Sequence, residues 1–195
     1  MPKLTQEQAS TAKRLRSGVR ARAADGGGGM IFKAPKACGK TSMIGGMNSK
    51  PPTKDGKCVN IFVACQTAYA EKQAEEVGVA PGVKPLTAGR MKMLEETLNG
   101  KGTVTVTLTP TSGGNLLNPK QKIHDELIKM LKKKGVDLIN LEIDEFHKWY
   151  QGRSAKPGQV AAFRAELLKK GIVMVVTGIT ATPIWDVKSK DQERL

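Results

Sequence analysis

The chain has 195 residues, of which 39% are hydrophobic and 26% charged, a composition typical of one globular domain rather than of a disordered chain. It has no apolar run near the roughly 18–20 residues of a membrane span, no apolar signal segment at its start and an odd number of cysteines. We therefore exclude membrane, secreted and disulfide-rich classes and expect an intracellular protein, in the cytoplasm, the nucleus or a viral replication site. 

Helices and strands are predicted to alternate along the chain. The expected elements, in chain order, are a basic helix over 5–24, a strand over 30–32, a short helix after 41, a strand over 59–64, a helix over 68–77, a short helix over 91–98, a strand over 103–108, a helix over 118–135, a strand over 138–143, a helix near 160–169 and a strand over 172–176. This order predicts an α/β fold in three layers, with a mostly parallel central sheet covered on both faces. Ligands of such sheets bind at the carboxyl ends of the strands.

The formal net charge of +14, from 32 lysines and arginines against 18 aspartates and glutamates, predicts a polyanionic partner. Nucleic acid, DNA or RNA, is the first candidate. Only 4% of the residues are aromatic, so base stacking is not expected to be the main mode of contact.

The segment 34–41 follows a predicted strand, precedes a short helix and ends in Gly39-Lys40-Thr41. It is similar to the phosphate-binding loop pattern, except that Ala34 stands at the first glycine. In such a loop backbone amides surround the phosphates, the lysine meets the β and γ groups and the hydroxyl binds Mg²⁺. A chance Gly-Lys-Thr in a lysine-rich chain is the alternative. The residues expected to bind ATP here are Ala37, Cys38, Gly39, Lys40, Thr41 and Ser42.

Two adjacent carboxylates, Asp144 and Glu145, follow the predicted strand 138–143. Asp144 can reach a Mg²⁺ ion bound by Thr41, and Glu145 would lie nearer the γ-phosphate, where it can orient and deprotonate water. Burying two neighbouring carboxylates is costly without a cation. An exposed Asp-Glu turn is the alternative, which the phosphate-loop pattern disfavours.

The last predicted strand is followed by small hydroxyl residues over 177–183. Their hydroxyls can hydrogen-bond both the side chain of His147 and the nucleotide site. Gly178 and Pro183 alone would also explain a turn at a strand end. The residues themselves leave this choice open.

Together, the segments 34–41, 144–147 and 180–183 resemble motifs I, II and III of superfamily-two DEAD/DEAH-like helicases. The resemblance extends from residue 30 to residue 183. Members of that family often carry alanine at the position of Ala34, but more usually glycine at the position of Ala37. The resemblance implies an N-terminal RecA-like ATP-binding lobe, a P-loop NTPase domain over 25–185, after a basic helical segment over 1–24 and before a polar tail over 186–195.

The same resemblance implies roles for individual residues. Lys40 and Glu145 would be catalytic, with Glu145 activating water, and Thr41 and Asp144 would hold Mg²⁺. His147 would couple the nucleotide site to the last strand through Thr180 and Thr182. 

Weaker correspondences concern nucleic acid and the adenine base. Gln66 and Thr67 stand where such helicases place motif Ia, and Thr109 and Pro110 would form a second loop on the nucleic-acid backbone. Gln8, in preference to Gln6, resembles the glutamine that reads adenine in many members. 

One more histidine, His124, lies near the start of a predicted helix and is expected to be solvated.

Helicases of this superfamily work with two RecA-like lobes, and an arginine from the second lobe can raise the rate of phosphoryl transfer by roughly 10³–10⁵. Neither a second phosphate loop nor an arginine-rich motif follows residue 183. We therefore expect a single ATP-binding lobe that needs a second lobe, in cis or in trans, for hydrolysis and unwinding. Two alternatives stay open: a phage terminase-type motor ATPase and a non-catalytic basic nucleic-acid-binding module.

Overall fold

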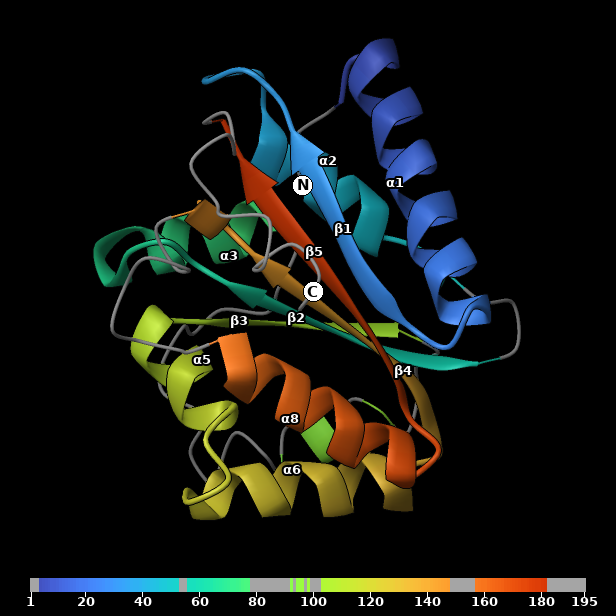
Figure 1. The fold of residues 1–195 in the computed structure, drawn as a ribbon. Helices are drawn as coiled ribbons and strands as arrows, with labels where there is room; N and C mark the ends of the chain where they lie inside the picture. Colours follow the sequence, from blue (N-terminus) through green and yellow to red (C-terminus); the bar gives the residue numbers. More distant parts are fainter. Residues whose placement is uncertain are drawn as a thin grey trace.

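The computed structural model describes residues 4–52, 56–77, 92, 94–96, 98, 103–147 and 157–181. Its strands form one five-stranded parallel sheet in the order β1-β5-β4-β2-β3 (Figure 1). The strands are β1 (Gly28–Lys33), β2 (Lys57–Val63), β3 (Thr103–Leu108), β4 (Val136–Ile143) and β5 (Val173–Thr180). The helices are α1 (Gln6–Ala24), α2 (Lys40–Asn48), the 3-10 helix η1 (Thr67–Tyr69), α3 (Ala70–Val77), α5 (Pro110–Leu116), α6 (Lys122–Lys133) and α8 (Pro157–Lys169).

Two hydrophobic cores lie on opposite faces of the sheet. Along β2, Phe62 belongs to the core under α1, α2 and α3, whereas Val63 belongs to the core under α5, α6 and α8. Successive strand residues point to opposite faces, so a strand covered on both sides is mainly apolar. The predicted three-layer α/β fold with a parallel sheet is confirmed (Figure 1).

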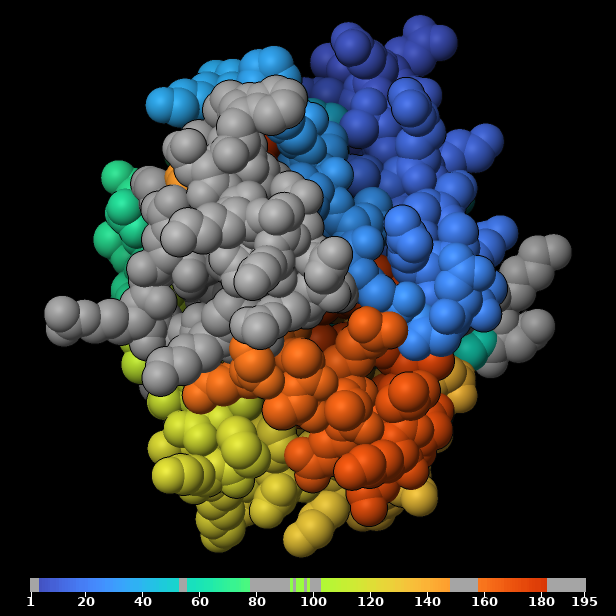
Figure 2. All heavy atoms as spheres, in the orientation of Figure 1, coloured from blue at the N-terminus to red at the C-terminus, as the bar shows by residue number. Residues whose placement is uncertain are grey.

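Helix α1 forms because a capping box closes its first turn. Thr5 Oγ1 accepts a hydrogen bond from the backbone N–H of Gln8 at 3.2 Å, and Gln8 Oε1 accepts one from the N–H of Thr5 at 3.0 Å. One side of the helix buries Ala12, Leu15 and Val19, and the opposite side lies at the surface, at the upper right of Figure 2. The basic N-terminal segment is therefore packed against the domain.

Several elements differ from the prediction. Strand β5 continues to Thr180, four residues further than expected, because Thr177 and Thr180 are buried in the sheet. Helix α5 was not expected, since its sequence contains Gly113 and Gly114. It forms because Thr109 caps it, accepting from the N–H of Ser112 at 3.2 Å, and a proline occupies its first position. 

Strands β1, β2 and β4 each begin two residues earlier than predicted, β1 within the glycine run, and helix α6 begins at Lys122 rather than at residue 118. The expected helix over 91–98 is seen at residues 92, 94–96 and 98. None of the described helices combines the length and the apolar character that crossing a membrane requires.

Candidate functional site

The segment 34–39 connects the carboxyl end of β1 to the N-terminus of α2. It begins where the N–H of Ala34 donates to the carbonyl of Thr180 on β5 at 3.2 Å. Ala37 has φ +60° and Gly39 has φ +83°, both in the left-handed region. A Cβ atom on Gly39 would lie 2.6 Å from Nε2 of Gln8, so that side chain would have to move, and the positive φ would strain any other residue; glycine is therefore favoured there. Ala37 stands where the helicase family more usually has glycine, and it adopts the left-handed backbone conformation that glycine favours.

Lys40 and Thr41 open helix α2 directly after this loop. The ammonium of Lys40 folds back over the loop, donating to the carbonyl of Pro35 at 3.0 Å and lying 3.5 Å from that of Ala34. The first N–H groups of a helix have no intrahelical acceptor, and the helix dipole adds positive potential there. Thr41 and Ser42, both half-buried, belong to this first turn. The arrangement is suited to an anion of phosphate size.

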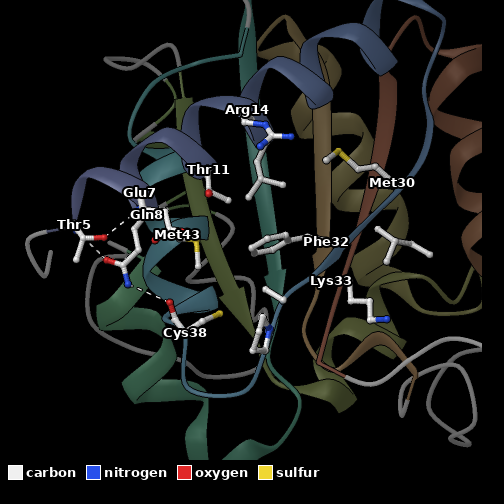
Figure 3. A pocket seen from close by; sticks show the side chains of 14 residues that line it. Thr5, Glu7, Gln8, Thr11, Arg14, Met30, Phe32, Lys33, Cys38 and Met43 are labelled. Carbon is white, nitrogen blue, oxygen red and sulfur yellow. Dashed lines mark hydrogen bonds between the residues drawn. The ribbon is translucent and has the colours of Figure 1, made fainter.

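Gln8 connects α1 to this loop. While its Oε1 completes the capping box, its Nε2 donates to the carbonyl of Cys38 at 3.1 Å (Figure 3). A cavity of about 840 Å³ extends from here between α1 and β1, with Thr11, Arg14 and Phe32 among its lining residues. Figure 3 shows Gln8 and Cys38 at one end of it. Gln6 is exposed and does not line this cavity.

Asp144 and Glu145 lie at the carboxyl end of β4, the same edge of the sheet as the loop 34–39. The N–H of Asp144 donates to the carbonyl of Val63 on β2 at 3.0 Å, which fixes the backbone as β4 ends. The Asp144 side chain is buried, and its Oδ2 accepts a hydrogen bond of 2.6 Å from Nε2 of Gln73 on α3. Glu145 has φ +46°, an uncommon conformation for glutamate.

His147 lies between Glu145 and the last strand. Its Nδ1 lies 2.9 Å from Oγ1 of Thr180, within hydrogen-bond distance, and 3.4 Å from Oε2 of Glu145. The predicted partners His147 and Thr180 are therefore brought together, whereas Thr182 lies outside the described residues. The coupling of the nucleotide site to the last strand through this contact stays a prediction.

The residues predicted to contact nucleic acid lie at the ends of β2 and β3. Gln66 and Thr67 are exposed where η1 begins. Thr109 is buried, and besides capping α5 it donates to Oγ of Ser112 at 2.9 Å. Thr109 and Pro110 therefore begin a helix rather than an open loop, and the Thr109 hydroxyl is occupied within the chain.

Beneath the site, polar side chains cross the α1–α2–α3 face of the sheet. We call this set the polar seam; its members are Asn48, Asn60, Thr105, Asn140, Glu142 and Thr177. Glu142, which is fully buried, accepts from Asn48 Nδ2 at 2.9 Å and from Asn140 Nδ2 at 2.7 Å. Burial, offset in part by the hydrogen bond from Asn48, raises the pKa of Glu142 to about 8.

Sequence reasoning missed the polar seam and Gln73. A signal for the seam existed, because Asn140 and Glu142 alternate with apolar residues in a strand that is otherwise buried on both faces. No comparable signal singled out Gln73, which is one polar residue among several on α3.

The expectation for His124 was wrong. The ring is buried against Phe163, with Nδ1 2.8 Å from the carbonyl of Leu116 and Nε2 2.9 Å from Oε2 of Glu166. The imidazole is thus paired on both sides, although its side-chain atoms and the carboxylates of Asp125 and Glu166 could in principle share a metal ion, lying within 4.8 Å of one another.

Five parallel strands between two helical layers, with the candidate residues at the carboxyl edge, define a RecA-like α/β domain, the fold of helicase lobes. The chain is similar over 100% of its length to the DUF1998 helicase MrfA bound to DNA and AMPPNP, with a TM-score of 0.53 and 15% sequence identity. A second structure of the DUF1998 helicase MrfA matches 93% of the chain, with a TM-score of 0.49 and 16% identity. At such identities the likeness concerns the fold.

The chain spans 28% and 30% of the lengths of these two helicase chains. No protein-family model and no curated protein matches its sequence.

Proposed function

We propose that the chain is the ATP-binding lobe of a nucleic-acid-dependent ATPase of helicase type. The observation that carries this proposal is the meeting of two predicted motifs at one sheet edge: the loop 34–39 with Lys40, and the group Asp144, Glu145 and His147. The similar helicase MrfA, whose structure holds DNA and AMPPNP, an ATP analogue, supports the same assignment.

The phosphates of ATP are expected on the backbone amides of the loop 34–39 and the first turn of α2. Lys40, which now donates to the carbonyl of Pro35, would turn to the β and γ phosphates, its stronger acceptors. The base would enter the cavity beside Gln8, whose volume of about 840 Å³ falls within the usual range for ligand pockets. One hydrogen on Nε2 of Gln8 remains for the base, because a primary amide has two and the bond to Cys38 uses one.

The residues that face this site suit Mg²⁺. Thr41 offers a hydroxyl and Asp144 a carboxylate, the hard oxygen donors that Mg²⁺ prefers. The buried Oε1 of Gln73, next to Asp144, has no hydrogen-bond partner among the described residues, which suits a hydrated ion. When bound, Mg²⁺ neutralises charge that develops on the phosphate oxygens.

Glu145 is the group we propose to orient and deprotonate the attacking water. His147, between Glu145 and Thr180, would orient that carboxylate and couple its position to strand β5. We expect efficient hydrolysis to require an arginine from a second lobe, and the exposed Gln66 and Thr67 to contact nucleic-acid phosphates.

Titration with a fluorescent ATP analogue in 0.1 M salt, with and without Mg²⁺ and single-stranded DNA, tests the proposal. Lys40→Ala should abolish nucleotide binding while the circular dichroism spectrum stays unchanged. Lys129→Ala, at an exposed lysine on α6 away from the loop, is the matched control and should bind as the wild type does.

A non-catalytic basic module would give a different pattern. It would bind DNA or RNA in a salt-dependent way that ATP does not change, and no nucleotide would bind. Rapid hydrolysis and unwinding by the 195-residue chain alone would contradict the need for a second lobe.

A further inference from the structure

Gln73 connects helix α3 to the carboxylate that the proposed function assigns to Mg²⁺. Its Nε2 donates to Oδ2 of Asp144 at 2.6 Å, across 71 residues of sequence. The other end of the same amide, Oε1, is buried and has no partner among the described residues. A half-buried glutamine thus has one hydrogen-bonding atom engaged and one buried without a donor.

The orientation of this amide follows from its partner. An ionised carboxylate only accepts hydrogen bonds, so it must face the NH₂ group and not the carbonyl oxygen of Gln73. Rotating the amide by half a turn would place two acceptors against each other. The buried oxygen is therefore a consequence of the bond to Asp144, and it is costly unless a donor reaches it.

A hydrated cation next to Asp144 supplies such donors. Mg²⁺ in proteins usually keeps several of its water ligands and is held by one or two carboxylates. Those water molecules donate hydrogen bonds to nearby acceptors. Residues that contact metal ligands in this way orient them, and their loss typically lowers metal affinity by about 10–100-fold.

We propose that Gln73 is a positioning residue for the metal site: its Nε2 orients the Asp144 carboxylate, and its Oε1 accepts a hydrogen bond from a water ligand of the bound ion. This inference rests on the proposed function, since it assumes that Asp144 serves an ATP-bound metal. It adds a residue from α3, the helix that directly follows η1 and the exposed pair Gln66 and Thr67.

Gln73→Met tests the role, because methionine is of similar size and offers neither the donor nor the amide oxygen. Mn²⁺ affinity, measured by electron paramagnetic resonance in the presence of ADP, should fall by about tenfold or more. Affinity for the fluorescent ATP analogue without metal should stay within about twofold. Gln159→Met, at a half-buried glutamine on α8, is the matched control and should leave both quantities unchanged.

Gln73→Glu shows whether a cation reaches Asp144 beside residue 73. Its second carboxylate repels Asp144 when no cation is present, so the metal-free melting temperature should fall. Bound cation screens that repulsion, so Mn²⁺ should raise the melting temperature of this variant more than that of the wild type. If Mn²⁺ gives no such recovery, no cation binds between Asp144 and residue 73, and this readout overturns the role of Gln73 even if Gln73→Met does not fold.

The outcomes that would overturn the role of Gln73 differ from the outcome that would overturn the proposed function. Mn²⁺ affinity of folded Gln73→Met within twofold of the wild type would overturn the role of Gln73, and so would a Gln73→Glu variant that Mn²⁺ does not stabilise. In either case Mg²⁺-dependent ATP binding by the wild type would still support the proposed function. A wild type that binds no nucleotide at all would instead overturn the proposed function, and this inference with it.

Discussion

Replacing Glu142 by glutamine should change how the stability of the protein depends on pH. Burial raises the pKa of Glu142 to about 8, against 4.5 for an unperturbed glutamate. Between these two values the native protein keeps the proton while the unfolded chain has lost it. The native state then binds more protons than the unfolded state, so its stability falls as pH rises.

The magnitude follows from the size of the pKa shift. Inside this window the free energy of unfolding falls by about 1.4 kcal/mol per pH unit for one proton. From pH 5.5 to pH 7.5 the contribution of Glu142 is therefore a loss of roughly 2–3 kcal/mol. In Glu142→Gln this loss disappears, because glutamine does not titrate. The buried Oδ1 of Asn48, which has no partner among the described residues, can turn to accept from the new amide.

Urea denaturation followed by circular dichroism at pH 5.5, 6.5 and 7.5 measures this difference. The difference in unfolding free energy, wild type minus Glu142→Gln, should decrease steadily across the series, and all other titrating groups cancel from it. Glu71→Gln, an exposed carboxylate on α3, should give a curve parallel to that of the wild type. Parallel curves for Glu142→Gln as well would refute the view that Glu142 is buried in its neutral form.

Three further substitutions probe packing and backbone conformation. Gly178→Ala would place a Cβ atom 2.8 Å from Cγ of buried Phe146, and should cost about 1–3 kcal/mol and lower the melting temperature by several degrees. Ala37→Gly relieves a left-handed alanine but adds freedom to the unfolded chain, so urea denaturation should show a net gain of about 0.5–1 kcal/mol. Arg16→Ala removes hydrogen bonds to the last carbonyls of α2 and should cost about 1–3 kcal/mol by urea denaturation, whereas Arg14→Ala, an exposed neighbour, should be neutral.

The parallel sheet and the place of the site were predictable because both depend on local patterns. Runs of valine and isoleucine identify strands that are buried on both faces, and parallel strands place their carboxyl ends at one edge. That is why His147, shortly after β4, and Thr180, at the end of β5, could be expected to lie close together, as they do at 2.9 Å.

The burial of His124 could also have been predicted, from the spacing of the apolar residues in its helix. It precedes Leu127 by three residues and Leu131 by seven, so it lies on the buried face of α6. Only its polar character argued for solvent. The burial is tolerated because the carbonyl of Leu116 and the carboxylate of Glu166 satisfy both ring nitrogens.

The contact between Gln73 and Asp144 could not be predicted in the same way. It depends on how α3 is rotated about its axis, which tertiary packing determines. Polar residues at positions 71, 72, 73, 75 and 76 are equivalent in the sequence, and only one of them faces the end of β4. Helix α5 was missed because its two glycines disfavour a helix more clearly than the Thr109 cap favours one. Tertiary packing explains Gly113, since a Cβ atom there would lie 2.9 Å from Cγ1 of Val63.

Some of the positive charge of the chain is engaged in contacts of α1 within the protein. Arg16 donates to the carbonyls of Gly46 and Met47 at the C-terminal end of α2, and Arg20 donates to that of Pro52. Arg16 offsets the negative end of the α2 dipole, and Arg20 is bonded to a carbonyl beyond that helix, so both count for less toward a nucleic-acid surface than the formal charge of +14 suggests.

Gln8 acts at the other end of α2, through the carbonyl of Cys38. Helix α1 therefore holds both ends of the helix that begins with Lys40. A change in α1 that breaks either contact is expected to loosen the loop 34–39, which we propose binds phosphate, whereas Asp144 lies on β4 and does not depend on these contacts. If the chain binds ATP–Mg²⁺ as proposed, both parts are needed at once, and we expect substitutions in α1 that break these contacts to lower nucleotide affinity.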